Sequence, residues 1–202
     1  IRQMVILGAG LDTRPYRLNG MDQVKVFEVD LPSVQNEKKK QIQKHFGQLP
    51  KNVSFVPIDF DTQALETVFA DSAFDSSQPA VFIWEGVTQY ISEAAVLKTL
   101  AFIGQSAPGS LLIFTYVLKS VIERRSSIDG ADKIMDRVSK GNAPWVFGLK
   151  PADVPPFLKP FHLKLIADVG SADYQARYLK PLGRNLVVSQ MERVVQAVVR
   201  RP

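Results

Sequence analysis

Four short stretches of this sequence place glycine or carboxylate residues directly after an apolar run. In chain order they are Gly8-Ala9-Gly10, Asp30, Asp59-Phe60 and Glu85. Glycines in such a turn let the backbone bend sharply and approach a ligand without a Cβ in the way. Because the carboxyl ends of parallel strands meet at one edge of a sheet, the four stretches predict one ligand-binding crevice.

Asp30 lies 20 residues after Gly10, at the end of the second apolar run. A carboxylate at this spacing typically accepts hydrogen bonds from the hydroxyl groups of a ribose. The alternative is that Asp30 caps the next helix, since Pro32 suits the first turn of a helix. Together with the glycine turn, Asp30 favours a nucleoside ligand.

The residues after Gly10 indicate which nucleoside. A dinucleotide-binding loop has a third glycine and places pyrophosphate on a helix N-terminus. Here the third glycine is missing, and Asp12 stands where the phosphates would lie and would repel them. Asp12 suits instead a cationic nucleoside without phosphate, such as S-adenosylmethionine (SAM), whose ammonium group it could face.

Asp59 and Glu85 fit the same ligand at two further strand ends. The Asp59 carboxylate could accept from the adenine amino group, while the Phe60 N–H could donate to a ring nitrogen. The alternative for residues 59–62 is a simple turn or helix cap, because Asp and Thr favour such positions. Glu85 precedes Gly86 and either lies in the crevice or is a solvated loop carboxylate.

The elements that must position these residues alternate along the chain. Apolar, β-branched runs predict seven strands, at residues 4–7, 24–29, 53–58, 80–84, 111–116, 163–169 and 190–199. Helical patterns occupy residues 33–46, 63–69, 92–105 and 171–179, with Ser92 as an N-cap. This alternation predicts a doubly wound, mostly parallel α/β sheet. We expect one domain over residues 1–202, with residues 118–160 forming a helical cap over the site.

Composition excludes several other kinds of site. Cysteine is absent and the two histidines, His45 and His162, are far apart in the sequence, so we expect no metal centre. The chain has no GxxxxGK[ST] loop and no GxSxG elbow, which argues against a P-loop NTPase and a hydrolase. No apolar run is long enough to span a membrane and no signal pattern begins the chain, so we expect a cytoplasmic protein without a membrane partner.

The stretches VILGAGLDTRPYRL, FEVDLP, VPIDF and IWEGVTQYIS together resemble the leucine carboxyl methyltransferase family, in its bacterial and mycobacterial SAM-dependent branch. PWVFGLKPADVPPFL and PLGRNLVVSQMERV are also similar to that branch. The resemblance implies the Rossmann-like class I methyltransferase fold, with strand order 3-2-1-4-5-7-6. It also implies that SAM contacts Gly8, Gly10, Asp30, Asp59, Phe60 and Glu85. Ala9 and Asp12, which lie in and just after the same turn, complete the set of expected cofactor-binding residues. The family has an N-terminal helical region ahead of the first strand, and we expect that region to be missing from this sequence.

The expected reaction is methylation of an oxygen atom, leaving S-adenosylhomocysteine. An acceptor carboxylate is ionised at neutral pH, with a pKa of about 4, so no catalytic base is needed. Positioning of the reactants, which can supply about 7–11 kcal/mol, is then the main task. Tyr90 is a candidate for orienting the acceptor, although simple packing explains it equally well.

The acceptor is expected to be a small molecule or a peptide, bound partly by the cap. Candidate contacts are Tyr116, Arg124, Arg125, Trp145, Phe147 and Arg177, although for each residue by itself a packing or surface role is favoured over a contact with the acceptor. Two other functions stay open. The net charge of +5 and a related tRNA-modifying branch allow a nucleic-acid substrate, and the fold could bind SAM without turnover.

Overall fold

A computed structural model describes residues 1–141 and 143–200 of the chain. Within that part, seven strands form one sheet in the order β3-β2-β1-β4-β5-β7-β6. The strands are β1 (Gln3–Leu7), β2 (Lys25–Asp30), β3 (Val53–Pro57), β4 (Ala80–Trp84), β5 (Leu111–Val117), β6 (Leu163–Val169) and β7 (Glu192–Val199). The seven expected strands and their expected order are therefore confirmed.

The pairing explains why the sheet is only mostly parallel. The strands β1 to β5 pair with one another in parallel. The last strand, β7, lies antiparallel between β5 and β6, and a register shift between Leu165 and Ala167 interrupts its pairing with β6. The carboxyl ends of β1 to β5 consequently share one edge of the sheet, where ligands of doubly wound folds bind.

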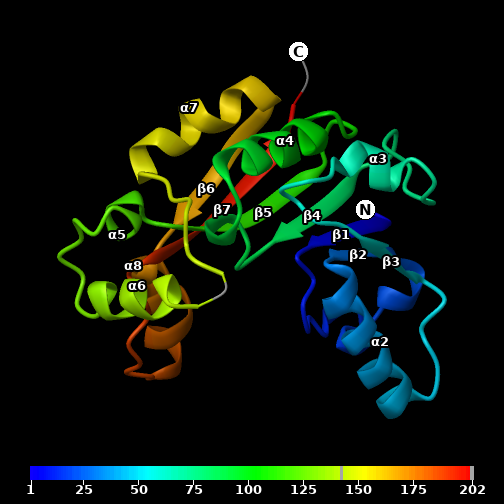
Figure 1. The fold of residues 1–202 in the computed structure, drawn as a ribbon, viewed down its shortest axis with the longest axis horizontal. Coiled ribbons are helices and arrows are strands. Elements are labelled where there is room, and N and C mark those ends of the chain that lie inside the picture. Colours follow the sequence, from blue (N-terminus) through cyan, green and yellow to red (C-terminus); the bar gives the residue numbers. More distant parts are fainter. Residues whose placement is uncertain (142, 201–202) are drawn as a thin grey trace.

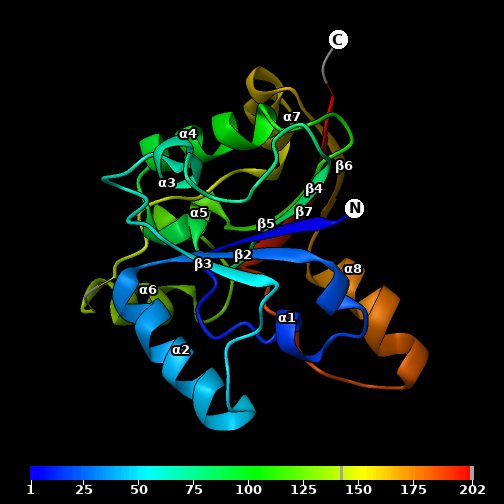
Figure 2. The ribbon, with the colours of Figure 1, turned by 90° about the vertical axis from the view of Figure 1, so that its right-hand side faces the viewer.

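Helices cover both faces of the sheet (Figures 1 and 2). On one face lie α3 (Leu65–Phe69), α4 (Glu93–Gly104) and α7 (Val154–Leu158), and on the other lie α1 (Arg14–Arg17), α2 (Pro32–Phe46) and α8 (Ser171–Tyr174). Each helix is short apart from α2 and α4. A sheet covered on both faces explains why its strands are nearly continuous apolar runs.

Most of the core lies between the sheet and the layer of α3, α4 and α7. Alternate residues of the central strands, such as Leu7, Phe82 and Phe114, are completely buried there. A smaller cluster on the opposite face joins Ile6 and Val26 to Met21 under α1 and α2. Because strand side chains alternate between the two faces, this division follows directly from the sequence of each strand.

The segment expected to form a cap, residues 118–160, contains only short helices among its described residues. They are α5 (Lys119–Ile122), α6 (Ala131–Ser139), the 3-10 turn Pro151–Asp153, α7 and part of the 3-10 turn Lys159–Phe161. Leu149 ties this segment to the end of β5, because its N–H donates to Val117 O (3.1 Å) and its carbonyl accepts from Lys119 N (2.9 Å).

Two helical expectations needed adjustment. The helix expected over residues 171–179 consists of α8 followed by a π-helical turn, Gln175–Leu179, and a 3-10 turn at Lys180–Leu182 comes next. The helix expected from residue 63 starts at Leu65. Ser92, in contrast, is the N-cap of α4 as expected, since its side chain accepts from Ala95 N.

Candidate active site

The glycine turn after β1 is fixed by backbone hydrogen bonds to β2. The N–H groups of Gly8 and Ala9 both donate to Val29 O, at 2.7 and 3.1 Å. Gly8 and Gly10 have φ angles of +68° and +41°, values that side-chain-bearing residues rarely adopt. A Cβ on Gly10 would find its nearest neighbour 3.9 Å away, so the backbone at Gly10 borders open space.

Asp30 joins the end of β2 to this turn. Its Oδ2 accepts from Gly10 N at 2.6 Å, and its Oδ1 accepts from Leu31 N at 2.7 Å. The N-cap of α2 is Leu31, which makes no side-chain cap, so Asp30 does not cap that helix. Each Asp30 oxygen has further accepting capacity, which a ribose hydroxyl could use.

Asp59 and Phe60 form a tight turn at the end of β3. Asp59 Oδ1 accepts from Asp61 N (3.0 Å), and Asp59 O accepts from Thr62 N (3.2 Å). The turn anticipated as an alternative therefore exists, and it leaves Asp59 Oδ2 without a partner among the described residues. Phe60 is partly buried against the main core. The contribution of both residues to cofactor binding stays a prediction.

Asp61 was not singled out from the sequence, yet it links this turn to α4. Its Oδ1 accepts from both the N–H (3.0 Å) and the hydroxyl (2.8 Å) of Ser92. The ends of β3 and of the loop after β4 are thereby fixed to each other.

Arg14 spans the crevice between β1 and β4 and was also missed. Its Nε lies 3.0 Å from Asp12 Oδ2, and its Nη2 contacts Glu85 Oε2. Asp12 is further held by Arg14 N, which donates to Oδ1 at 2.7 Å. Two carboxylates predicted to contact SAM thus share one guanidinium, which remains 30% exposed.

A buried polar cluster lies beneath the glycine turn. Lys38 Nζ is 2.8 Å from Glu28 Oε2 and donates to Ala9 O at 3.3 Å, while Tyr16 OH donates to Glu28 Oε1 at 2.8 Å. The Glu28 side chain is fully buried. Burial raises the pKa of Glu28, although Lys38 and Tyr16 oppose that shift, and it also raises the pKa of Tyr16. The cluster ties the carbonyl of Ala9 to α2.

Tyr90 lies in the loop after β4 and is 41% exposed. Its ring meets the Trp145 ring edge to face, with centroids 6.2 Å apart. Val146 N donates to Gln89 O at 2.7 Å, which holds the same two segments together. The segment around Trp145 therefore lies against the loop that carries Glu85, and the acceptor contact expected of Tyr90 stays a prediction.

The other acceptor-contact candidates are engaged within the protein. Tyr116 is buried and its hydroxyl donates to Asp168 (2.8 Å), which together with burial raises the pKa of Tyr116. Phe147 packs in the main core beside Phe157. The three arginines pair with acidic neighbours: Arg124 with Asp136, Arg125 with Glu123 and Arg177 with Asp173.

A hollow of about 440 Å³ lies beside Glu85. Its wall comes from the loop after β4, from β5 and β7 and from α8, through residues that include Gly86, Thr115, Tyr174 and Glu192. Burial raises the pKa of the Tyr174 hydroxyl, as do neighbouring Tyr178, Glu85 and Glu192. This hollow therefore adjoins a predicted site residue.

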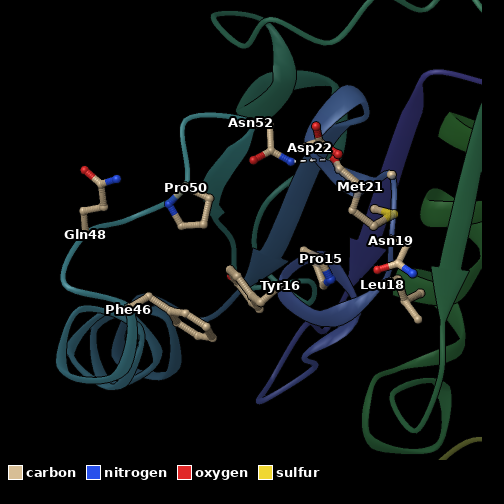
Figure 3. Close-up of a pocket in the computed structure, with 11 residues that line it drawn as sticks. Pro15, Tyr16, Leu18, Asn19, Met21, Asp22, Phe46, Gln48, Pro50 and Asn52 are labelled. Atoms are coloured by element: carbon tan, nitrogen blue, oxygen red, sulfur yellow. Dashed lines mark hydrogen bonds between the residues drawn. The ribbon is translucent and has the colours of Figure 1, made fainter.

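A second hollow of about 440 Å³ lies between α1 and the loop after α2 (Figure 3). Pro15, Tyr16 and Phe46 form one side of it and Asn52 donates to Met21 O at its far end (2.8 Å). None of the predicted cofactor residues lines it.

In the described part of the chain, no group of three or more His, Asp or Glu side chains is placed to hold a metal ion. Across residues 1–141 and 143–200, every helix is too short or too polar to cross a bilayer.

The strand order and crevice are those of the class I SAM-dependent methyltransferase fold. An O-methyltransferase family protein from Burkholderia thailandensis superposes with a TM-score of 0.63 at 12% identity, covering 98% of this chain and 50% of that one. The protein PKMT2 from Rickettsia typhi, solved in complex with AdoHcy (S-adenosylhomocysteine), gives a TM-score of 0.59 at 12% identity, covering 99% and 50%.

Sequence comparison identifies the family. Residues 1–104 match the family model described as leucine carboxyl methyltransferase, and this chain belongs to that family. A Mycolicibacterium paratuberculosis protein named "Putative S-adenosyl-L-methionine-dependent methyltransferase" is 38% identical over 113 residues. That match spans 55% of this chain and 36% of the relative's length.

Proposed function

We propose that this chain carries the cofactor site of a SAM-dependent O-methyltransferase whose acceptor is a carboxyl group. The observation that carries the proposal is the convergence of Gly10, Asp30 and Glu85 at one edge of the sheet in a chain of this family. The parallel pairing of β1 to β4 supports the proposal, because it brings the carboxyl ends of these four strands to that edge.

The residues present suit a cationic nucleoside. The open backbone at Gly10 leaves room for a ribose, and Asp30 offers acceptor oxygens for its hydroxyls. The Asp59 carboxylate and the N–H of Phe60 would hydrogen-bond to the adenine edge. Bound SAM would supply a methyl group on a sulfonium, from which a nucleophilic oxygen can displace the thioether. Asp12 and Glu85 would repel a pyrophosphate in the same place.

The protein's task with a carboxylate acceptor is to hold it in line and exclude water. An ionised carboxylate needs no base, and the residues that line the hollow beside Glu85 include no histidine or lysine. The hollow beside Glu85 would take the acceptor, and Tyr90 would orient it from the neighbouring loop. Because an anion and a cation neutralise each other in the reaction, a drier site favours it.

Calorimetric titration with S-adenosylhomocysteine tests the cofactor, with NAD as the comparison ligand. Binding of S-adenosylhomocysteine without binding of NAD is the expected result, and the reverse preference would refute the proposal. A substitution of Asp30 gives the site-specific test. Asp30→Ala should lower the affinity for S-adenosylhomocysteine at least tenfold, because hydrogen bonds to charged groups contribute about 1.5–3 kcal/mol.

The acceptor is tested by methyl transfer from radiolabelled SAM to carboxylate-bearing small molecules and peptides. Methyl esters release volatile methanol in base, whereas ethers do not, so base-labile label would support a carboxyl acceptor. Base-stable label would point instead to a hydroxyl acceptor, and label in added tRNA would favour a nucleic-acid substrate.

A further inference from the structure

A hollow of about 470 Å³ lies at the edge of the sheet that β6 forms. Its volume falls within the range of about 300–1,000 Å³ that is usual for small-molecule sites. None of its described lining residues is an aspartate or a glutamate. The basic residues that line it, and that make it positively charged, are Lys159, His162, Lys164 and Arg200.

Backbone contacts bring these four basic residues together. Arg200 N donates to His162 O at 2.8 Å, and His162 N donates to Lys159 O at 3.2 Å. Lys164 follows in β6, where it is paired with Val198 of β7. All four positions therefore belong to one backbone framework, where β6 begins and β7 ends, near the mark C in Figure 1.

The basic hollow lies away from the crevice that holds the candidate active site. Since β7 runs antiparallel to both β5 and β6, β6 points in the same direction as β5. The start of β6 is consequently at the amino edge of the sheet, whereas Glu85 follows the carboxyl end of β4. None of the predicted cofactor residues lines the basic hollow. A ligand bound there would leave the site proposed for SAM free.

The positive side chains at the basic hollow have no acidic partners. In residues 1–141 and 143–200, none of Lys159, Lys164 and Arg200 forms an ion pair with a carboxylate, and all three are exposed. Arg177 and Arg193, by contrast, each pair with an aspartate. Positive charges gathered without counter-charges repel one another, and a bound anion would relieve that repulsion.

Three positive side chains suit an anion that carries more than one negative charge. A carboxylate carries only one, whereas a phosphate group carries about 1.5–2 near pH 7 and a diphosphate carries more. The N–H donors of arginine match the geometry of phosphate oxygens, and lysine binds phosphate as a point charge. Pro155, Leu163 and Leu165 line the same hollow and offer an apolar surface to the organic part of a ligand.

We propose that the basic hollow binds the phosphate or diphosphate group of a small organic molecule, with Lys159, Lys164 and Arg200 contacting its oxygens. The basic side chains gather around one hollow and not along a stripe, which favours a compact anion over a nucleic-acid backbone. This inference does not rest on the proposed function, because the hollow shares no residue with the candidate active site.

Titration calorimetry with inorganic pyrophosphate, in buffer without divalent cations, tests this site. Citrate is the comparison anion, because it carries several negative charges on carboxylates, and it should bind more weakly. Arg200→Ala and Lys164→Ala should each lower the affinity for pyrophosphate about tenfold, as expected for a hydrogen bond between charged groups. Neither substitution removes a backbone hydrogen bond of the framework, so both variants should bind S-adenosylhomocysteine as the unmutated chain does.

Lys44→Ala is the matched control, because it removes the same charge from an exposed position of α2. That helix contacts β3, and the strand order places β3 and β6 at opposite edges of the sheet. This variant should bind pyrophosphate as tightly as the unmutated chain does. Thermal melting of each variant shows that it is folded at the titration temperature.

Several outcomes would overturn the phosphate site. No binding of millimolar pyrophosphate to the unmutated chain would refute it directly, and equal affinity for citrate would remove the assignment to phosphate. Equal losses in Lys44→Ala and Arg200→Ala would mean that affinity follows net charge alone. Displacement of pyrophosphate by S-adenosylhomocysteine would place it in the crevice instead. A single-stranded RNA that binds more tightly than pyrophosphate, and that Arg200→Ala weakens, would assign this edge to a nucleic acid.

Discussion

Gly8 and Gly10 share a left-handed backbone but differ in what surrounds them. A Cβ on Gly8 would lie 2.1 Å from Val87 Cγ2, whereas one on Gly10 would contact nothing closer than 3.9 Å. Each alanine costs about 1–2 kcal/mol through its backbone conformation. We therefore expect Gly8→Ala to lower the free energy of unfolding, measured in urea, clearly more than Gly10→Ala.

Val87→Ala provides the control for the Gly8 prediction. It removes the methyl group that the new Cβ would meet, so the double variant should recover the excess loss and keep only the backbone cost. If the double variant is no more stable than Gly8→Ala, steric overlap with Val87 is not the cause. Gly10→Ala should instead impair S-adenosylhomocysteine binding, because its Cβ would enter the space proposed for the ribose.

Lys38 and Glu28 give a prediction with a definite pH dependence. Burial raises the pKa of Glu28 in the folded protein, and Lys38 limits that rise. When the pKa of a carboxyl is higher in the folded state than in the unfolded state, the group stabilises the fold at pH values below its unfolded-state pKa. That stabilisation is lost as the pH rises through the folded-state pKa. Lys38→Met removes the limiting charge, so it should cost about 3–5 kcal/mol at pH 8 and less at pH 5.

Urea unfolding of Lys38→Met and of the unmutated chain at both pH values measures this difference. Titration of groups that the two proteins share cancels in the comparison. The variant Glu28→Gln/Lys38→Met has no carboxyl at this position, so its deficit should be the same at pH 5 and pH 8. A deficit in Lys38→Met that does not change with pH would show that Glu28 is not the responsible group.

At the scale of elements, α4 depends on its N-cap residue, Ser92. The Ser92 hydroxyl accepts from Ala95 N at 3.2 Å and donates to Asp61 Oδ1 at 2.8 Å, so one side chain caps α4 and ties it to the turn after β3. Ser92→Ala should destabilise the protein by about 1–2 kcal/mol in chemical denaturation. Ser92→Thr retains the hydroxyl, so its free energy of unfolding should lie within about 0.5 kcal/mol of that of the unmutated chain. Equal losses from both variants would exclude the hydroxyl as the cause.

The strands and their ends could be predicted because local sequence determines them. Buried parallel strands such as Ala80–Trp84 are apolar throughout, and the polar residues that follow them mark the carboxyl edge. The segment 118–160 was harder, because its short helices depend on contacts such as that of Leu149 with Val117. Such pairings between distant positions leave no periodic pattern.

At the scale of the whole molecule, the sequence indicates where the candidate site residues lie along the chain, but not which side chains contact one another. Asp30 and Glu85 could be placed because each ends a strand. Arg14 could not, since its partner Glu85 is 71 residues away and only the sheet order brings them together. Lys38 sits in a run of three lysines that resembles a solvated helix face, yet its side chain is only 5% exposed.

The hydrophobic clusters predict unequal local stability. The largest cluster spans the sheet from Val5 to Val199, whereas a separate small cluster holds α5 and α6 through residues such as Val121 and Met135. Fewer buried contacts mean a lower cost of local opening. Hydrogen-exchange mass spectrometry should therefore show faster exchange in residues 119–139 than in β4 and β5, and equal protection of these regions would contradict the prediction.

The antiparallel strand β7 has a consequence for synthesis on the ribosome. A nascent chain in which only residues before 192 have emerged can pair β5 with β4, but β6 has no partner because the strand that lies between β5 and β6 is still missing. Both would then present unpaired N–H and C=O groups, which attract other strands and promote aggregation. Glu192–Val199 supplies the missing partner of both β5 and β6, so these eight residues decide whether the two strands reach their native pairing.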